Sequence, residues 1–128
     1  MNLLLDSHLL IWSSSSSKRL SLAARSLINN SDNDLFFSAA SLWELAIKQG
    51  SERKGFHVDV LLLRQGLLEN GYNEISVTSD HAIATRALPA IHKDPFDRIL
   101  IAQAIVEDLI LLTADSVVAR YPGPIKKV

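Results

Sequence analysis

The sequence predicts an α/β domain with a mainly parallel five-stranded sheet flanked by helices on both faces. Short apolar runs alternate along the chain with longer segments whose apolar residues recur at helical spacing. The order of strand then helix persists from end to end, which favours parallel pairing and a sheet covered on both sides. At 128 residues the chain can bury one core, so we expect a single domain over residues 1–128.

Each expected strand is a short apolar segment bounded by polar or turn-forming residues. The clearest is Leu-Ile-Leu-Leu-Thr at residues 109–113, because an unbroken apolar run is typical of a strand buried on both faces. The five expected strands cover residues 2–5, 35–37, 72–77 and 109–113, with an extended tail from Ile125.

The expected helices end at recognisable breakers: Gly50, the Asn70-Gly71 pair and Pro89. Five consecutive serines at residues 13–17 predict a flexible loop, and residues 51–55 a charged loop. The expected helices cover residues 7–12, 21–30, 38–49, 58–69, 80–88, 95–107 and 116–121.

The helix that begins at Pro95 has an unusual start. Asp94 suits the N-cap, where its carboxylate accepts from free backbone N–H groups, and Pro95 suits the first helical position. Capping explains Asp94 well. It explains Asp97 less well, because the helix behind it is apolar on almost every side and is therefore expected to be buried. A buried carboxylate needs a partner, often a metal ion.

Composition narrows the class of protein. Apolar residues make up 48% of the chain and aromatic residues only 6%, which indicates an aliphatic core. Cysteine is absent, so we expect neither disulfides nor a thiolate metal site, and the cytoplasm is the default compartment. The N-terminus lacks the pattern of a signal peptide, and we expect no membrane span. A net charge of −1 excludes a globally basic nucleic-acid binder, although a local basic patch remains open.

Four acids occupy positions where a ligand site is expected. Asp6 directly follows the first strand, Asp115 lies two residues after the strand that ends at Thr113, and Asp97 opens the helix before that strand. Glu44 lies within a helix, among apolar residues. In open parallel sheets, ligands bind outside the carboxyl ends of the strands. We therefore expect these four carboxylates to converge.

Each acid also has a simpler interpretation. Asp6 and Asp115 could cap the helices that follow them, and Glu44 could face water beside Ser41 and Lys48. If the acids do converge, their charges repel unless a cation neutralises them. Oxygen ligands without cysteine select a hard ion such as Mg²⁺ or Mn²⁺. Such an ion can activate water and stabilise charge on a phosphoryl oxygen, which is chemistry for phosphodiester hydrolysis.

Several segments together resemble the PIN-domain proteins, specifically the toxin ribonucleases of the VapC type. The resemblance runs from end to end and is most specific at Asp-Pro-Phe-Asp-Arg, residues 94–98, with Ile-Ala-Gln-Ala behind it. It implies a PIN-like fold, Mg²⁺ or Mn²⁺ as cofactor, RNA as substrate, a cognate antitoxin as inhibitor, and a homodimer. The matching segments are residues 5–12, 38–48, 92–104, 112–115 and 119–122.

Carried over residue by residue, the resemblance implies a catalytic metal site formed by Asp6, Glu44, Asp97 and Asp115. Position 7 is Ser where this subgroup usually has Thr, which keeps the hydroxyl; the serine run is the other departure.

Further residues are expected around this site. Hydroxyls of Ser7 and Thr113 could hydrogen-bond the ligating acids, with Asp94 as a further supporting residue. His92 is expected to fix the loop before its helix rather than to bind metal. RNA phosphates could contact a set of basic residues, namely Arg98, Lys48, Arg53 and Lys54; Arg98 could alternatively pair with Asp94.

Two other functions stay open at this point. One is a non-catalytic RNA- or protein-binding module with the same fold. The other is a different acid-cluster phosphotransfer enzyme such as a phosphatase, although the expected second Asp, two residues after Asp6, is His8 here.

A further prediction concerns the antitoxin. Trp12, Trp43 and the leucines of helix 58–69 offer more apolar area than one sheet face needs, so part of it could form a groove for an apolar helix. The alternative is that all of these residues belong to the core. The leucines in question are Leu61, Leu62, Leu63, Leu67 and Leu68.

Overall fold

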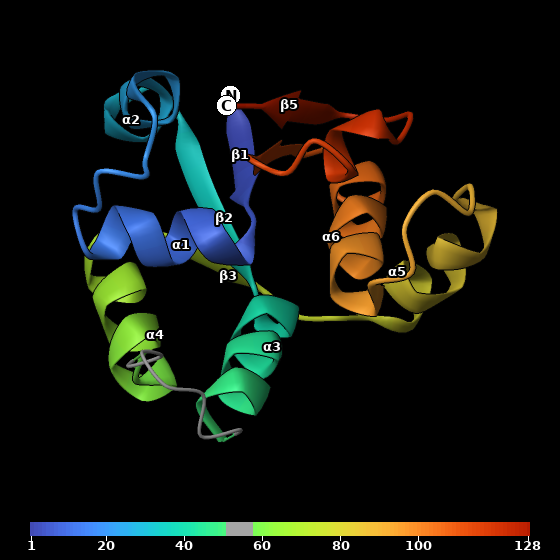
Figure 1. Cartoon of the computed structure of the whole chain (residues 1–128), viewed down its shortest axis with the longest axis horizontal. Coiled ribbons are helices and arrows are strands. Elements are labelled where there is room, and N and C mark those ends of the chain that lie inside the picture. Colours follow the sequence, from blue (N-terminus) through green and yellow to red (C-terminus); the bar gives the residue numbers. More distant parts are fainter. Residues whose placement is uncertain (51–57) are drawn as a thin grey trace.

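A computed structural model describes residues 1–50 and 58–128, and its five strands form one sheet (Figure 1). The strand order is β3-β2-β1-β4-β5, and every pairing is parallel. The predicted α/β architecture with a mainly parallel five-stranded sheet is confirmed. The strands are β1 (Asn2–Leu5), β2 (Asp34–Ser38), β3 (Asn73–Ile75), β4 (Ile110–Thr113) and β5 (Ile125–Lys127).

The helices follow the predicted order with shifted ends. Two of the predicted helices were too long. The helix expected over residues 80–88 is a short α-helix followed by a 3-10 turn, and the one expected over residues 116–121 is a single 3-10 turn. The elements are α1 (Ser7–Ser14), α2 (Leu22–Asn29), α3 (Ala39–Gly50), α4 (Val60–Glu69), α5 (Ser79–Ala84), η1 (Thr85–Ala87), α6 (Pro95–Val106) and η2 (Val118–Arg120).

The shortening near residue 118 has a local cause. The Asp115 side chain accepts from the backbone N–H of Val117 at 2.7 Å, which forms a turn rather than a regular helix start. At the other end, Tyr121 precedes Pro122 and is extended, with ψ of 143°, because the proline ring disfavours helical geometry in the residue before it.

The serine run was predicted to be a loop, but its first two residues belong to α1. The Ser13 hydroxyl donates to the carbonyl of Leu10 at 3.1 Å, and the Ser14 hydroxyl to that of Ile11 at 2.9 Å. These bonds to the preceding turn let serine remain helical. The prediction was wrong for Ser13 and Ser14.

Helices cover both faces of the sheet, as predicted. The three leucines of β1 alternate between two cores: Leu3 and Leu5 pack in a cluster with residues of α1, α3 and α4, whereas Leu4 packs with residues of α6. In Figure 1, α1 and α4 lie on one side of β1 and α6 on the other. Within the described ranges, no helix is long and apolar enough to cross a membrane.

The topology defines where a ligand site is expected. From β1 the chain builds β2 and β3 on one side, and β4 and β5 lie on the other. The order therefore reverses between β1 and β4, and in such sheets ligands bind at the carboxyl ends of the strands beside that point. Because α6 leads back to the start of the parallel strand β4, its N-terminus lies near this carboxyl edge.

Candidate active site

The carboxyl ends of β1 and β4 are joined through the hydroxyl of Thr113. This hydroxyl donates to Asp6 Oδ2 at 2.6 Å and accepts from the backbone N–H of Asp115 at 3.0 Å. The other oxygen of Asp6 accepts from the N–H of Leu9 at 3.0 Å, which caps α1. The simpler interpretation therefore holds in part, since Asp6 caps α1 and Asp115 forms a turn. Both residues also lie next to each other at the carboxyl edge where a ligand site is expected.

Glu44 reaches the same region from α3. Its side chain is only 12% exposed, and its Oε1 accepts from the Ser7 hydroxyl at 2.6 Å. Its Oε2 lies 3.3 Å from Nζ of Lys48, one helical turn onward. Ser7 directly follows Asp6, so this hydrogen bond ties the Glu44 carboxylate to the end of β1.

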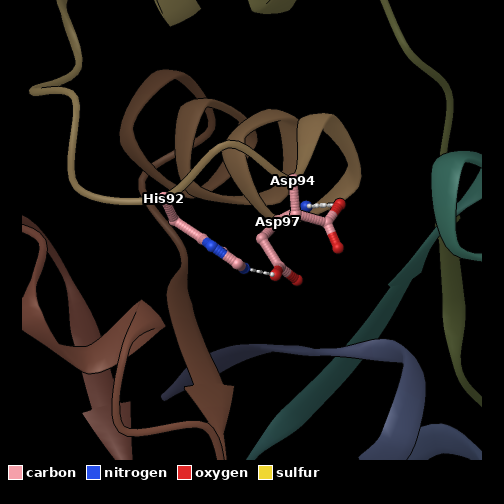
Figure 2. A group of neighbouring side chains, drawn as sticks. All are labelled: His92, Asp94 and Asp97. Carbon is pink, nitrogen blue, oxygen red and sulfur yellow. Dashed lines mark hydrogen bonds and ion pairs between the residues drawn. The ribbon is translucent and has the colours of Figure 1, made fainter.

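Three side chains gather where α6 begins (Figure 2). Asp94 caps the helix as predicted, accepting from the N–H of Phe96 at 2.8 Å and of Asp97 at 3.4 Å. Asp97 Oδ2 lies 2.9 Å from Nε2 of His92, and its side chain is 20% exposed. Ligand atoms of His92, Asp94 and Asp97 all lie within 4.8 Å of one another.

Burial and mutual repulsion raise the pKa of two of the acids. Burial raises the pKa of Asp6, while the hydrogen bond from Thr113 and that from Leu9 partly offset this. Burial is also the main cause at Asp97, whose pKa rises to about 6. The negative charges of Asp94, Glu44 and Asp115 raise it further, and His92 opposes them.

These electrostatic interactions connect the four predicted acids, which we call the acid cluster (Asp6, Glu44, Asp97 and Asp115). Asp97 is repelled by Glu44 and by Asp115, and Asp6 by Asp115. The acids thus lie near one another, but in the described part of the chain the tight group of ligand atoms contains only Asp97 of the four. An oxygen-rich, partly buried set with raised pKa values suits a hard divalent cation.

His92 is the residue near Asp97 whose contact the sequence did not predict. Its backbone fixes the loop as expected: the N–H donates to the Tyr121 hydroxyl at 2.7 Å, and that hydroxyl donates to the His92 carbonyl at 3.0 Å. The ring contact with Asp97 and the part played by Tyr121 carried no sequence signal, because both depend on how two distant segments pack.

The predicted RNA-contacting residues differ in their surroundings. Arg98 donates to the carbonyls of Pro89, Thr85 and Leu88 and to the Tyr121 hydroxyl, at 2.8 to 3.3 Å. It therefore braces the segment before α6 instead of pairing with Asp94. Lys48 contacts Glu44. Arg53 and Lys54 lie outside the described residues.

The apolar surface expected to form an antitoxin groove divides into two parts. On α4, Leu63 and Leu67 are buried in the core, whereas Leu61 and Leu62 are 64% and 63% exposed. A cavity of about 700 Å³ is lined by Leu62 and by other residues of α1, α2 and α4. Trp12 packs against this core, whereas Trp43 lines a separate cavity on the other side of α3.

Comparisons with known proteins identify the family of this chain. The family model of the PIN domain matches residues 3–124. The chain therefore belongs to the PIN-domain family, and the predicted PIN-like fold is confirmed. Ribonuclease VapC22 of Mycobacterium tuberculosis is 36% identical over 125 aligned residues, and the match covers 95% of this chain and 95% of that protein. The VapC-type resemblance is thereby confirmed.

Solved structures support the fold. One similar chain comes from the crystal structure of VapBC2 from Rickettsia felis bound to a DNA fragment from its promoter. The TM-score is 0.71 and the identity 15%, and the match covers 99% of this chain and 98% of that chain. This chain also matches one in DNA-bound VapBC from Salmonella typhimurium with a TM-score of 0.69 and 18% identity, at the same coverage. A chain in a toxin–antitoxin complex from Klebsiella pneumoniae matches with a TM-score of 0.62 and 21% identity, and the match covers 96% of this chain and 94% of that one.

Proposed function

We propose that this chain is a toxin ribonuclease that hydrolyses RNA phosphodiester bonds with Mg²⁺ or Mn²⁺. The acid cluster would hold the ion, and a cognate antitoxin would inhibit the enzyme in the cytoplasm. The observation that carries the proposal is that acids from distant segments gather at the carboxyl ends of β1 and β4: Thr113 joins Asp6 to the Asp115 turn, and Ser7 ties Glu44 to the end of β1. Burial and the neighbouring carboxylates also raise the pKa of Asp97 to about 6. Several ionised carboxylates so close together are unfavourable at neutral pH unless a cation neutralises their charge. The ribonuclease relative, 36% identical, supports the reaction class.

The protein's own groups would serve mainly to hold the carboxylates in place. Thr113 orients Asp6 through its hydroxyl, and Ser7 orients Glu44. Asp94 begins the helix that presents Asp97, and His92 opposes the negative charge of Asp97. When bound, a divalent ion would supply an activated water molecule and stabilise negative charge on a phosphoryl oxygen.

The direct test is RNA cleavage by the purified protein. The wild type should degrade total RNA with Mg²⁺ or Mn²⁺ and stop when a chelator is added. Asp6→Asn and Asp97→Asn should lose cleavage while their circular dichroism spectra stay native, since each keeps the side-chain volume but loses a ligand charge. Full activity in either variant, or cleavage that survives chelation, would refute the site assignment.

The exposed leucines of α4 support an antitoxin surface. Leu62 lines the 700 Å³ cavity and the neighbouring Leu61 is exposed. An apolar helix in a groove is a recurrent mode of recognition. Leu62→Glu should weaken co-purification with the cognate antitoxin, whereas Leu22→Glu, at the 85% exposed residue on α2, should not. Equal capture by both variants would place the antitoxin elsewhere.

We also expect a homodimer, which sedimentation velocity would detect.

A further inference from the structure

One tyrosine holds the loop before α6 to the segment that follows β4. Tyr121 directly follows η2 and is only 4% exposed. Its ring packs in the core cluster that includes Leu4 of β1 and Leu100 of α6. Because side chains in a close-packed core have little freedom to move, this packing also fixes the position of the Tyr121 hydroxyl.

The hydroxyl of Tyr121 uses all of its hydrogen-bonding capacity on this loop and on α6. It accepts from the backbone N–H of His92 at 2.7 Å and donates to the carbonyl of the same residue at 3.0 Å. It also accepts from Nη1 of Arg98 at 3.1 Å. A hydroxyl has one proton to donate and two lone pairs that accept, so all three are in use. Both backbone polar groups of His92 are therefore held by one side chain.

The fixed backbone of His92 holds its ring against Asp97 (Figure 2). Nε2 of the ring lies 2.9 Å from Oδ2 of Asp97. An ionised carboxylate can only accept a hydrogen bond, so the ring is the donor to it. A carboxylate that is held at one oxygen keeps one orientation and can offer the other oxygen to an ion.

The same tyrosine belongs to the segment that carries a second acid. The N–H of Ala119 donates to the carbonyl of Asp115 at 3.1 Å, and the N–H of Tyr121 donates to the carbonyl of Val118 at 3.1 Å. Short-range hydrogen bonds thus connect Asp115 to Tyr121. The hydroxyl thereby links the segment after β4 to the segment before α6, and these two segments carry Asp115 and Asp97.

A simpler interpretation is that the hydroxyl only satisfies buried polar groups of the loop. The loop has another support, however, because Arg98 donates to three of its carbonyls. These belong to Thr85, Leu88 and Pro89 and lie earlier in the chain than His92. The contribution of Tyr121 is therefore local to His92, the residue whose ring contacts Asp97.

We propose that Tyr121 is a positioning residue of the metal site: its hydroxyl holds the His92 backbone so that the His92 ring orients Asp97 as a ligand of the divalent ion. The proposal rests on the proposed ribonuclease function. It adds to that function a residue that sets the affinity for the ion without touching the ion or the RNA. Loss of such a supporting group typically lowers metal affinity about 10- to 100-fold.

Binding of Mn²⁺ to the purified protein tests this role, with the electron paramagnetic resonance signal of free Mn²⁺ as the measure. Tyr121→Phe keeps the ring but removes the hydroxyl, so the Kd for Mn²⁺ should rise about 10- to 100-fold. Tyr72→Phe is the matched control, because the other tyrosine of the chain is also buried but lies in the other core cluster. It should bind Mn²⁺ as the wild type does. An unchanged Kd for Tyr121→Phe, or an equal loss in Tyr72→Phe, would overturn the proposal.

His92→Ala shows whether Tyr121 acts through the His92 ring. This change keeps the backbone groups that Tyr121 holds and removes the contact with Asp97. It should weaken Mn²⁺ binding about as much as Tyr121→Phe does. The double variant should bind no more weakly than either single variant, because both changes remove the same contact. Losses that multiply in the double variant would contradict the proposed path through His92.

RNA cleavage separates this proposal from the proposed function. Tyr121→Phe should cleave slowly at limiting Mn²⁺ and regain the wild-type rate at saturating Mn²⁺, because all four acids are intact. A rate that stays low at saturating Mn²⁺, or a variant that does not fold, would show that the hydroxyl supports the fold and not the binding of the ion. If the wild type binds Mn²⁺ and loses affinity in Tyr121→Phe but never cleaves RNA, the positioning role stands and the nuclease function is refuted. If the wild type binds no Mn²⁺, both are wrong.

Discussion

Replacing Asp97 by Asn tests whether the acids form a metal site or only helix starts. The pKa of Asp97 is raised from 3.8 to about 6 in the folded protein. A proton is therefore held more tightly in the folded state, and the stability that it contributes is present below pH 3.8 and lost as pH rises through 6. At pH 7 the full shift corresponds to about 3 kcal/mol. Because Asp97 is partly exposed, solvent screening reduces this to about 1 to 2 kcal/mol.

Asp97→Asn removes this cost together with a favourable helix-dipole interaction of about 0.3 to 1 kcal/mol. The balance is a gain, so the metal-free variant should melt a few degrees above wild type at pH 7. Near pH 4 the difference should vanish or reverse, because Asp97 is then largely protonated in the folded wild type. Mg²⁺ at a hundred times its dissociation constant should stabilise the wild type by about 2.7 kcal/mol, and the variant less.

The assay is thermal melting of both proteins at pH 4 and pH 7, with Mg²⁺ and with chelator. Asp80→Asn is the matched control, because Asp80 is also an acid in the first turn of a helix and is exposed. It should lose only the small dipole interaction. Because its four acids are intact, Mg²⁺ should stabilise it as much as it stabilises the wild type. A destabilised Asp97→Asn at pH 7, without a Mg²⁺ response in either protein, would mean that the acids merely begin helices and that no metal site exists.

Three other predictions test separate parts of the structure. Thr113→Val removes the hydroxyl that orients Asp6, so RNA cleavage should fall about 10- to 100-fold; an unchanged rate would show that Asp6 needs no such support. His92→Ala removes the group that lowers the pKa of Asp97, so the NMR titration of the Asp97 carboxyl in metal-free protein should move to higher pH, and a move to lower pH would contradict the assignment. Leu67→Ala, at a core residue 3% exposed, should cost about 2 to 5 kcal/mol in denaturant melts, whereas Leu61→Ala on the exposed face of α4 should stay within about 0.5 kcal/mol; similar losses would place both residues in the core.

The sequence by itself determined the fold class and the order of the elements. The spacing of apolar residues along the chain follows from which side of each helix or strand is buried. In β1 and β4 the apolar run is unbroken, because both faces of these strands are buried. The positions of Asp6 and Asp115 could also be predicted, because an acid that follows a parallel strand lies at the strand's carboxyl end whatever the rest of the chain does. Asp94 was predictable as a cap for the same reason, since capping is local.

Only the tertiary structure decided which of these groups meet. The contact between His92 and Asp97, the Ser7 bond to Glu44 across 37 residues, and the packing of Trp43 on Phe96 join segments that no local pattern relates. Arg98 illustrates the same limit. Its charge suggested RNA or Asp94 as a partner, but the loop before α6 offered several carbonyls within its reach. Local backbone preferences act over a few residues, whereas these contacts depend on how α3 and α6 pack around the sheet.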